Sequence, residues 1–198
     1  MQRELSRAMA VIPHPSIVFL GFMPYAGDEL ARRFLTLSYR EVAVGSVYDS
    51  VGSYLDTKAD ACARLGDAKC ERAYYDSIAT MLTNRPLSGA GEESLLAELA
   101  LAQAALGRET ESRRTLDRLF ALRSRTASRS DRTDGLDATV MAGSYARLGQ
   151  PDSAVSWLER SLAKGIGLYS AQSLAINPKL RLLRGTPAFE RMLLAHPR

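Results

Sequence analysis

Apolar residues recur at three- and four-residue intervals along most of the chain, which is the spacing of an amphipathic α-helix. The stretch after Gly91 shows this best, because Leu95, Leu99, Ala102 and Leu106 follow one another along a single helical face. Two acidic residues directly after Gly91 suit the positive end of a helix macrodipole. The pattern predicts helices joined by turns, and hence an all-α fold.

The same turn signal appears three times, at residues 64–67, 105–108 and 147–150. Each copy has a leucine followed by a glycine, and such a glycine ends a helix in the left-handed conformation. The three glycines are 41 and 42 residues apart. An alanine stands seven residues before each glycine and a large apolar residue nine after it: Ala59, Ala100 and Ala142, then Tyr75, Leu116 and Leu158. The chain therefore predicts three long helical hairpins that must stack to bury their apolar faces.

Helix signals also organise the two ends of the chain. Asn177-Pro178 and Thr186-Pro187 each place an N-cap residue before a proline, and Gly185 ends the first of these helices. Earlier in the chain we expect one helix over 28–44 and another from 46 to 65, and loops over 83–91 and 123–135. The prediction is one domain: irregular N-terminal helices over 1–45, three hairpins over 46–165 and a two-helix cap over 168–198.

These hairpins resemble the tetratricopeptide repeat, a helix–turn–helix unit with small residues at fixed positions and a glycine near its turn. Their spacing exceeds the usual 34 residues, so they resemble long-helix variants. Residues 174–178, 183–187 and 189–193 are similar to the ending of such arrays in bacterial signalling proteins, among them serine/threonine kinases, nucleotide cyclases and winged-helix regulators. The resemblance implies a right-handed α-α superhelix with a short two-helix C-terminal cap, and it carries no catalytic residue.

Composition and hydropathy indicate a folded, helix-rich protein that does not insert into a membrane. The 198 residues are 46% hydrophobic and 24% charged, which excludes wholesale disorder. Ala and Leu contribute 28 residues each against 13 Val plus Ile, a bias toward helix. The apolar stretch over 16–23 is too short to span a bilayer, so we expect no membrane insertion. The expected location is the cytoplasm, and the alternative is a soluble extracytoplasmic part of a signalling protein.

Candidate catalytic chemistry is sparse. His14 lies between prolines and His196 lies two residues from the end, so neither has the fixed position that a general base needs. Cys62 and Cys70 lack further ligands for zinc and are expected to be small core residues, with a disulfide conceivable only if their Cα atoms approach within about 7 Å. Trp157 is expected in the core. We predict no enzyme, no metal and no cofactor.

A basic segment of the chain suggests nucleic-acid binding as a second possible function. The net charge of +4 is mild, but Arg113–Arg132 contains seven arginines and two aspartates. This run could contact nucleic acid, although it has no aromatic residue in its loop part to stack on bases. A small-molecule sensor is a third class.

Protein–protein interaction is the favoured function. First helices line the concave groove of tetratricopeptide arrays, and the resemblance carries that role to six residues counted from the turn glycines: Asp56, Asp60, Arg64, Leu101, Thr139 and Arg147. A groove with acidic and apolar positions suits a partner segment with basic and apolar anchors. We therefore expect a non-catalytic module, a scaffold or sensory region of a bacterial signalling system. The sequence does not predict its oligomeric state.

Overall fold

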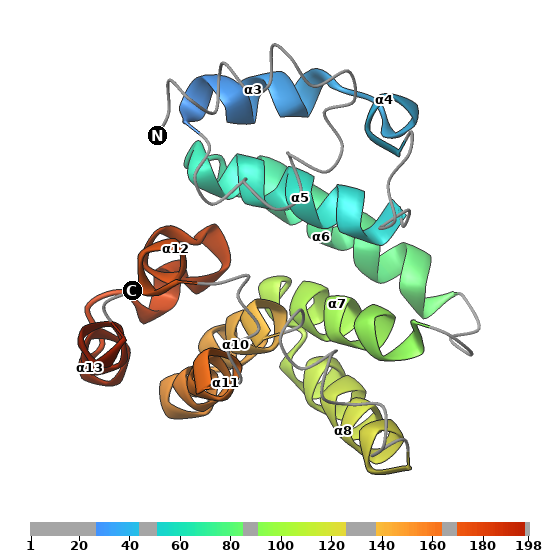
Figure 1. Cartoon of the computed structure of the whole chain (residues 1–198). Coiled ribbons are helices and arrows are strands. Elements are labelled where there is room, and N and C mark those ends of the chain that lie inside the picture. The colour runs from blue at the N-terminus through green and yellow to red at the C-terminus, as the bar shows by residue number, and fades with distance from the viewer. Residues whose placement is uncertain (1–26, 44–50, 85–90, 126–137, 164–169, 197–198) are drawn as a thin grey trace. The chain divides into compact units, whose positions relative to one another are not determined.

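A computed structural model describes residues 27–43, 51–84, 91–125, 138–163 and 170–196, and within these ranges the chain forms helices and no strand (Figure 1). The predicted all-α class is confirmed. In chain order the elements are α3 (Asp28–Thr36), α4 (Tyr39–Ala43), α5 (Val51–Arg64), α6 (Ala68–Thr83), α7 (Glu92–Ala105), α8 (Glu109–Arg125), α10 (Ala138–Arg147), α11 (Pro151–Ala163), α12 (Ala171–Ile176), the 3-10 helix η2 (Pro178–Leu183) and α13 (Pro187–Ala195).

Contacts divide the chain into two compact units, Met1–Ser77 and Ile78–Arg198. Unit 1 includes α3, α4, α5 and the first part of α6, whereas unit 2 includes the rest of α6 and every element from α7 to α13. The boundary falls inside α6, the second helix of the first predicted hairpin.

The three predicted hairpin turns have the same backbone conformation. Gly66, Gly107 and Gly149 have φ values of +73°, +76° and +71°. In each turn the residue after the glycine donates its N–H to a carbonyl five residues back, at 2.9 to 3.0 Å. Its own carbonyl then accepts a hydrogen bond from the residue four positions later, which starts the second helix. A left-handed residue in this position is what makes glycine necessary there.

Equivalent positions around the turns are buried alike. The alanines seven residues before the glycines, Ala59, Ala100 and Ala142, are fully buried. The large residues nine positions after the glycines, Tyr75, Leu116 and Leu158, are at most 3% exposed. In the second hairpin the Ser112 hydroxyl also donates to the Ala100 carbonyl at 2.8 Å, a hydrogen bond that joins the two helices. Positions at the same distance from each turn glycine are therefore buried to the same extent.

Unit 2 places its helices in two layers. α7 packs on α8 and α10 packs on α11; α10 also contacts both α7 and η2, and α11 contacts α13. The first layer is therefore α7, α10 and η2, and the second is α8, α11 and α13. Gly143 allows the helices of the first layer to pack closely, because a Cβ atom at this position would lie 3.3 Å from the Leu101 Cδ1 atom and 3.4 Å from the Lys179 Cβ atom.

The core of the last hairpin and the C-terminal segment is continuous. Its buried residues come from α10, α11, α12, η2 and α13, with Phe189 fully enclosed. The predicted start signals are present, since Asn177 accepts from the Lys179 N–H at 2.9 Å and Pro187 opens α13. A further short helix, α12, precedes them, because Ser170 and Ser173 cap its first turn reciprocally. The cap thus has three helical segments where the sequence predicted two.

Unit 1 has a small separate core. Ala31, Phe34, Val42 and Ala61 are its buried residues, where α3 packs on α5. The helix expected over 28–44 is interrupted after Thr36, and α4 restarts it at Tyr39. A capping box causes the interruption: Ser38 donates its backbone N–H to the Glu41 carboxylate at 2.6 Å, and the Glu41 N–H approaches the Ser38 hydroxyl oxygen at 3.4 Å.

A lysine from α5 closes the end of α3. Lys58 is 3% exposed, and its ammonium donates to the Leu35 and Leu37 carbonyls at 2.7 and 2.8 Å. The same Nζ atom lies 5.5 and 5.1 Å from the ring centroids of Phe34 and Tyr54. Burial lowers the pKa of Lys58, and the Glu41 carboxylate opposes that shift. The ammonium replaces the intrahelical donors that the last carbonyls of a helix lack.

The two cysteines form a disulfide across the α5–α6 turn. Their Cα atoms are 5.6 Å apart, within the range a disulfide requires, and they lie four residues on either side of Gly66. Cys62 is fully buried, as expected of a core residue, but Cys70 is half-buried. The condition that the sequence analysis set for a disulfide is therefore met, because the tight turn brings the end of one helix against the start of the next, and the expectation of a core position is wrong for Cys70.

Candidate functional site

The groove positions of unit 2 lie where helices pack on one another. Leu101 is 1% exposed and Thr139 is 4% exposed. Arg147, on the last turn of α10, donates to the Lys179 carbonyl at 3.1 Å and to the Gly143 carbonyl at 3.3 Å. The side of α10 that the sequence assigned to a partner thus contacts the chain's own η2 and α7.

The three groove positions of unit 1 lie together on α5. Asp60 is buried, whereas Asp56 and Arg64 are half-buried. The Arg64 Nε atom is 3.9 Å from an Asp28 carboxylate oxygen at the start of α3. The structure therefore brings the predicted residues together in two sets, one in each unit, and half of the six side chains are buried.

Two arginines in the described part of the basic run are paired with acidic residues on α7. Arg118 contacts Glu92 at 3.1 Å, and Arg123 contacts Glu93 at 3.2 Å. Arg123 is 8% exposed and belongs to α8, which continues two residues beyond the predicted start of the loop. Residues 126–132 of the run lie outside the described residues. Arg113, Arg114 and Arg125 remain exposed on α8.

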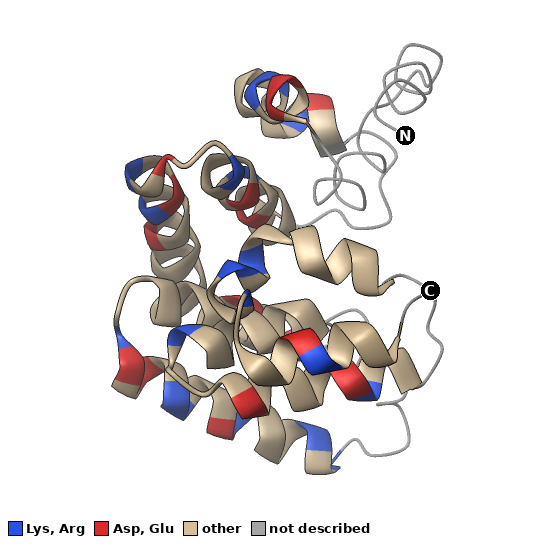
Figure 2. Ribbon diagram, turned by 90° about the vertical axis from the view of Figure 1, so that its left-hand side faces the viewer, with Lys and Arg blue, Asp and Glu red and all other residues tan. Residues whose placement is uncertain are grey.

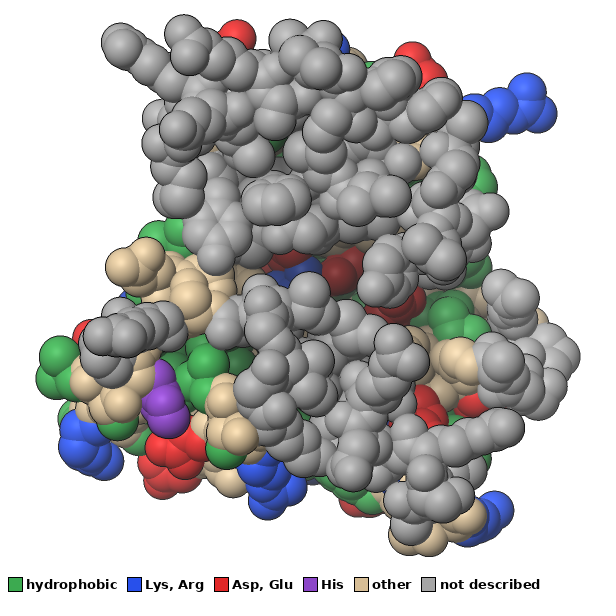
Figure 3. All heavy atoms as spheres, viewed as in Figure 1, with side chains coloured by type: hydrophobic (Ala, Val, Ile, Leu, Met, Phe, Trp, Pro, Cys, Tyr) green, Lys and Arg blue, Asp and Glu red, His purple; other side chains and the backbone are tan. Residues whose placement is uncertain are grey.

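Acidic and basic side chains are interleaved over the surface. Figure 2 shows both signs on the same helices. In the face drawn in Figure 3, hydrophobic, basic and acidic side chains are interspersed among the described residues. A long phosphate backbone is best held by a row of basic groups, so this interleaving does not favour nucleic-acid binding.

A partly exposed aromatic cluster lies where α8, α10 and α11 meet, and it includes Trp157, which the sequence assigned to the core. Phe120 of α8 stacks on Trp157 of α11 with ring centroids 5.9 Å apart and an interplanar angle of 22°. The guanidinium carbons of Arg123 and Arg160 lie 5.5 and 5.4 Å from the indole centroid. Phe120, Trp157 and the nearby Tyr145 of α10 are all half-buried. Helical spacing predicted that Trp157 faces the core. It could not show how much of the side chain the neighbouring helices leave exposed.

Tyr145 joins this cluster electrostatically. Burial raises the pKa of its phenol, and the Asp117 carboxylate raises it further. A hydrogen bond with the Trp157 side chain and the positive charges of Arg160 and Arg113 act in the opposite direction. We call the set Phe120, Tyr145, Trp157, Arg113 and Arg160 the aromatic face. It combines the residue types, Trp, Tyr and Arg, that most often dominate binding energy at protein interfaces.

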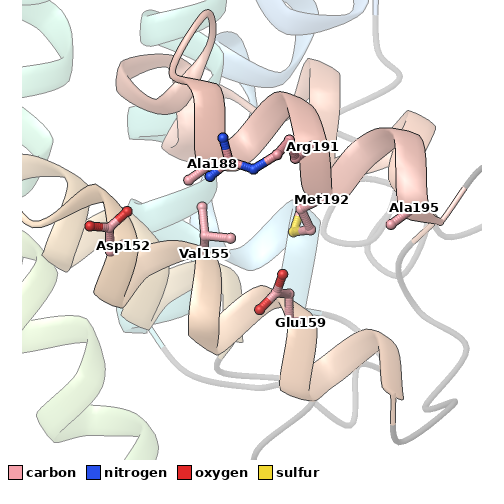
Figure 4. Close-up of a pocket in the computed structure, with 7 residues that line it drawn as sticks. All are labelled: Asp152, Val155, Glu159, Ala188, Arg191, Met192 and Ala195. Carbon is pink, nitrogen blue, oxygen red and sulfur yellow. The ribbon is translucent and has the colours of Figure 1, made fainter.

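A groove between α11 and α13 lies elsewhere in the second layer (Figure 4). Its volume is about 330 Å³, at the lower end of the range for ligand pockets. Val155 and Met192 form an apolar floor, and the side chains of Asp152, Glu159 and Arg191 surround it. The groove is open to solvent and offers charged groups of both signs, so it can hold an exposed side chain of a partner but does not enclose a small molecule.

No protein-family model, curated protein or solved structure matches the chain.

Two further kinds of site were sought in the described residues. In the described ranges no three His, Cys, Asp or Glu residues lie close enough together to bind a metal ion. No helix among the described elements is long and apolar enough to cross a bilayer.

Proposed function

We propose that the chain is a non-catalytic, tetratricopeptide-like helical array that binds a protein partner. The observation that carries this proposal is the threefold recurrence of one turn conformation, with the same buried small and large residues around it. Repeated hairpins that stack on their neighbours form extended surfaces, and such surfaces commonly serve recognition. The C-terminal residues similar to those of bacterial signalling arrays support a scaffold or sensory role.

The partner would bind the second layer of unit 2. The predicted groove positions of the first layer expose few side chains to a partner, because Leu101 and Thr139 are buried and Gly143 lies close to both Leu101 and Lys179. The second layer presents the aromatic face and the α11–α13 groove. The groove residues predicted on α5 (Asp56, Asp60 and Arg64) belong to unit 1 and stay a separate candidate.

The disulfide favours the extracytoplasmic alternative for the location. Disulfides persist in oxidising compartments and are rare in the cytosol, where thiol reductants keep cysteines reduced. Acid-quenched alkylation of native cells, followed by mass spectrometry of the peptides with Cys62 and Cys70, would test this. Unlabelled, linked cysteines support an oxidising compartment, and two labelled thiols contradict it.

The test of the proposed function is capture of a partner from a native lysate treated with nuclease. The full chain is the bait, and an unrelated helical-repeat protein of similar size is the control. We expect a protein that the control does not retain and that, once purified, binds the chain saturably. Recovery of no such protein contradicts the proposal. A rise in melting temperature with a small metabolite would then favour the sensor alternative.

A further inference from the structure

The aromatic face is a surface with unusually large side chains left partly uncovered. Trp157 and Tyr145 lie at the edge of the core that α10, α11 and the C-terminal helices share, and both stay half-buried. Phe120 extends the same surface onto α8. Aromatic side chains contribute large contact area and lose little conformational freedom on binding, which is why they act as anchors at interfaces.

The face is also held in place before any partner arrives. Arg123, which is buried and paired with Glu93, lies over the Trp157 indole, and Phe120 stacks on the same ring. Tyr145 and Trp157 also pack against the same core. Because these contacts fix the indole, binding to it costs less side-chain ordering than binding to a mobile aromatic residue would.

Exposed charges of both signs lie beside the aromatic residues. Arg113 of α8 and Arg160 of α11 are exposed and act on the Tyr145 phenol, and so does the exposed Asp117 of α8. Glu159, which follows Trp157 on α11, lines the groove toward α13 instead. Two arginines against one aspartate leave the aromatic face with a small positive excess, which complements an acidic partner segment.

We propose that the aromatic face binds an acidic peptide segment of a partner protein, with an aromatic or aliphatic side chain of that segment packed on Trp157 and Phe120. Carboxylates of the segment would pair with Arg113 and Arg160. This inference rests on the proposed function and specifies its partner. A nucleic acid fits less well, because a phosphate backbone needs a continuous row of basic groups, whereas this face offers two exposed arginines beside apolar aromatic rings.

The probe is a phage-displayed library of random twelve-residue peptides, selected on the full chain. The test variant is Arg113→Glu with Arg160→Glu, both at exposed positions. The matched control is Arg32→Glu with Arg33→Glu, which makes the same charge change at exposed positions of α3 in unit 1. Circular dichroism and urea unfolding check that each variant is folded.

We expect enrichment of peptides with Asp or Glu beside Trp, Phe or Leu. Affinity for a selected peptide should fall at least tenfold in the test variant and stay unchanged in the control. Replacing the acids of the peptide with lysine should restore binding to the test variant. The substitution Asp117→Asn should raise affinity for the acidic peptide about threefold, a gain that misfolding cannot produce.

Several results overturn the inference. Enrichment of basic peptides, absence of enrichment, or equal binding by the test variant and wild type each exclude an acidic segment on this face. A dimer that only the test variant dissociates would assign the face to a second copy of the chain. Competition by duplex DNA or RNA, lost in the same variant, would assign it to nucleic acid. If lysate capture still returns a partner, the proposed function survives these outcomes.

Discussion

A single lysine fastens α3 to α5 in unit 1. Lys58 occupies a helical position among apolar neighbours, where the sequence gives no sign of its role, since a lysine usually keeps its ammonium in water. Its two carbonyl acceptors, on Leu35 and Leu37, lie more than 20 residues away. Only the packing of α3 across α5 brings donor and acceptors together.

Replacing this lysine should destabilise the chain. Lys58→Met keeps the apolar stem but leaves two carbonyls at the end of α3 without their donor, so we expect the free energy of unfolding to fall by about 2 kcal/mol. Urea unfolding followed by circular dichroism measures the change. The control Lys69→Met alters an exposed lysine on α6 and should change stability by less than about 0.5 kcal/mol. Equal effects of the two variants would contradict the assigned role.

The capping box at Ser38 predicts a pH dependence. Hydrogen bonds from the Ser38 backbone and hydroxyl lower the pKa of Glu41 below its ordinary 4.5. A lowered folded-state pKa means that the stabilisation is present above the unfolded value and is lost as pH falls through the folded one. Wild type should therefore lose its stability advantage over Glu41→Gln as urea unfolding is repeated from pH 6 down to acid. An advantage that grows on acidification would contradict this.

At the scale of elements, the disulfide constrains the first hairpin. Changing Cys62 and Cys70 to serine releases a short closed loop, and we expect a loss of about 2 kcal/mol in unfolding free energy. Wild type treated with a dithiol reductant should unfold at the same urea concentration as the double variant. Unchanged stability on reduction would show that the cross-link does not constrain the hairpin.

Arg123 links three helices and should behave unlike its neighbour in the basic run. Arg123→Met leaves the half-buried Glu93 carboxylate without its guanidinium and removes a group from the Trp157 ring. We expect a loss of about 2 kcal/mol in unfolding free energy. Arg125→Met, at an exposed position, should stay within about 0.5 kcal/mol of wild type. Similar small effects in urea unfolding would mean that Arg123 is a surface residue.

Helix ends were only partly predictable from local signals. The glycine turns and the Asn-Pro and Thr-Pro starts depend on neighbours in sequence, and the structure has them where predicted. The break between α3 and α4 and the start of α12 also follow local capping boxes, at Ser38 and Ser170. These two signals stand in the sequence as Ser-x-x-Glu and Ser-x-x-Ser, but at Ser38 the apolar spacing continues across the break and predicts one unbroken helix.

At the scale of the molecule, the repeat register predicted which residues are buried but not which surface stays open. Counting from the glycines located Leu101 and Thr139 on first helices, yet their burial depends on how closely α7, α10 and η2 approach. The exposure of Trp157 depends likewise on the spacing of α8 and α11. Such distances arise from packing between hairpins, which no local pattern encodes.

Hydrogen–deuterium exchange of the full chain, with and without the captured partner, tests the central claim that the second layer of unit 2 is a recognition surface. We predict slowed amide exchange in α8 and α11 on binding, with little change in α3 and α4. The Arg113→Glu, Arg160→Glu variant should lose that protection at the same partner concentration. Protection confined to α5, or to elements other than α8, α10, α11 and α13, would contradict the claim.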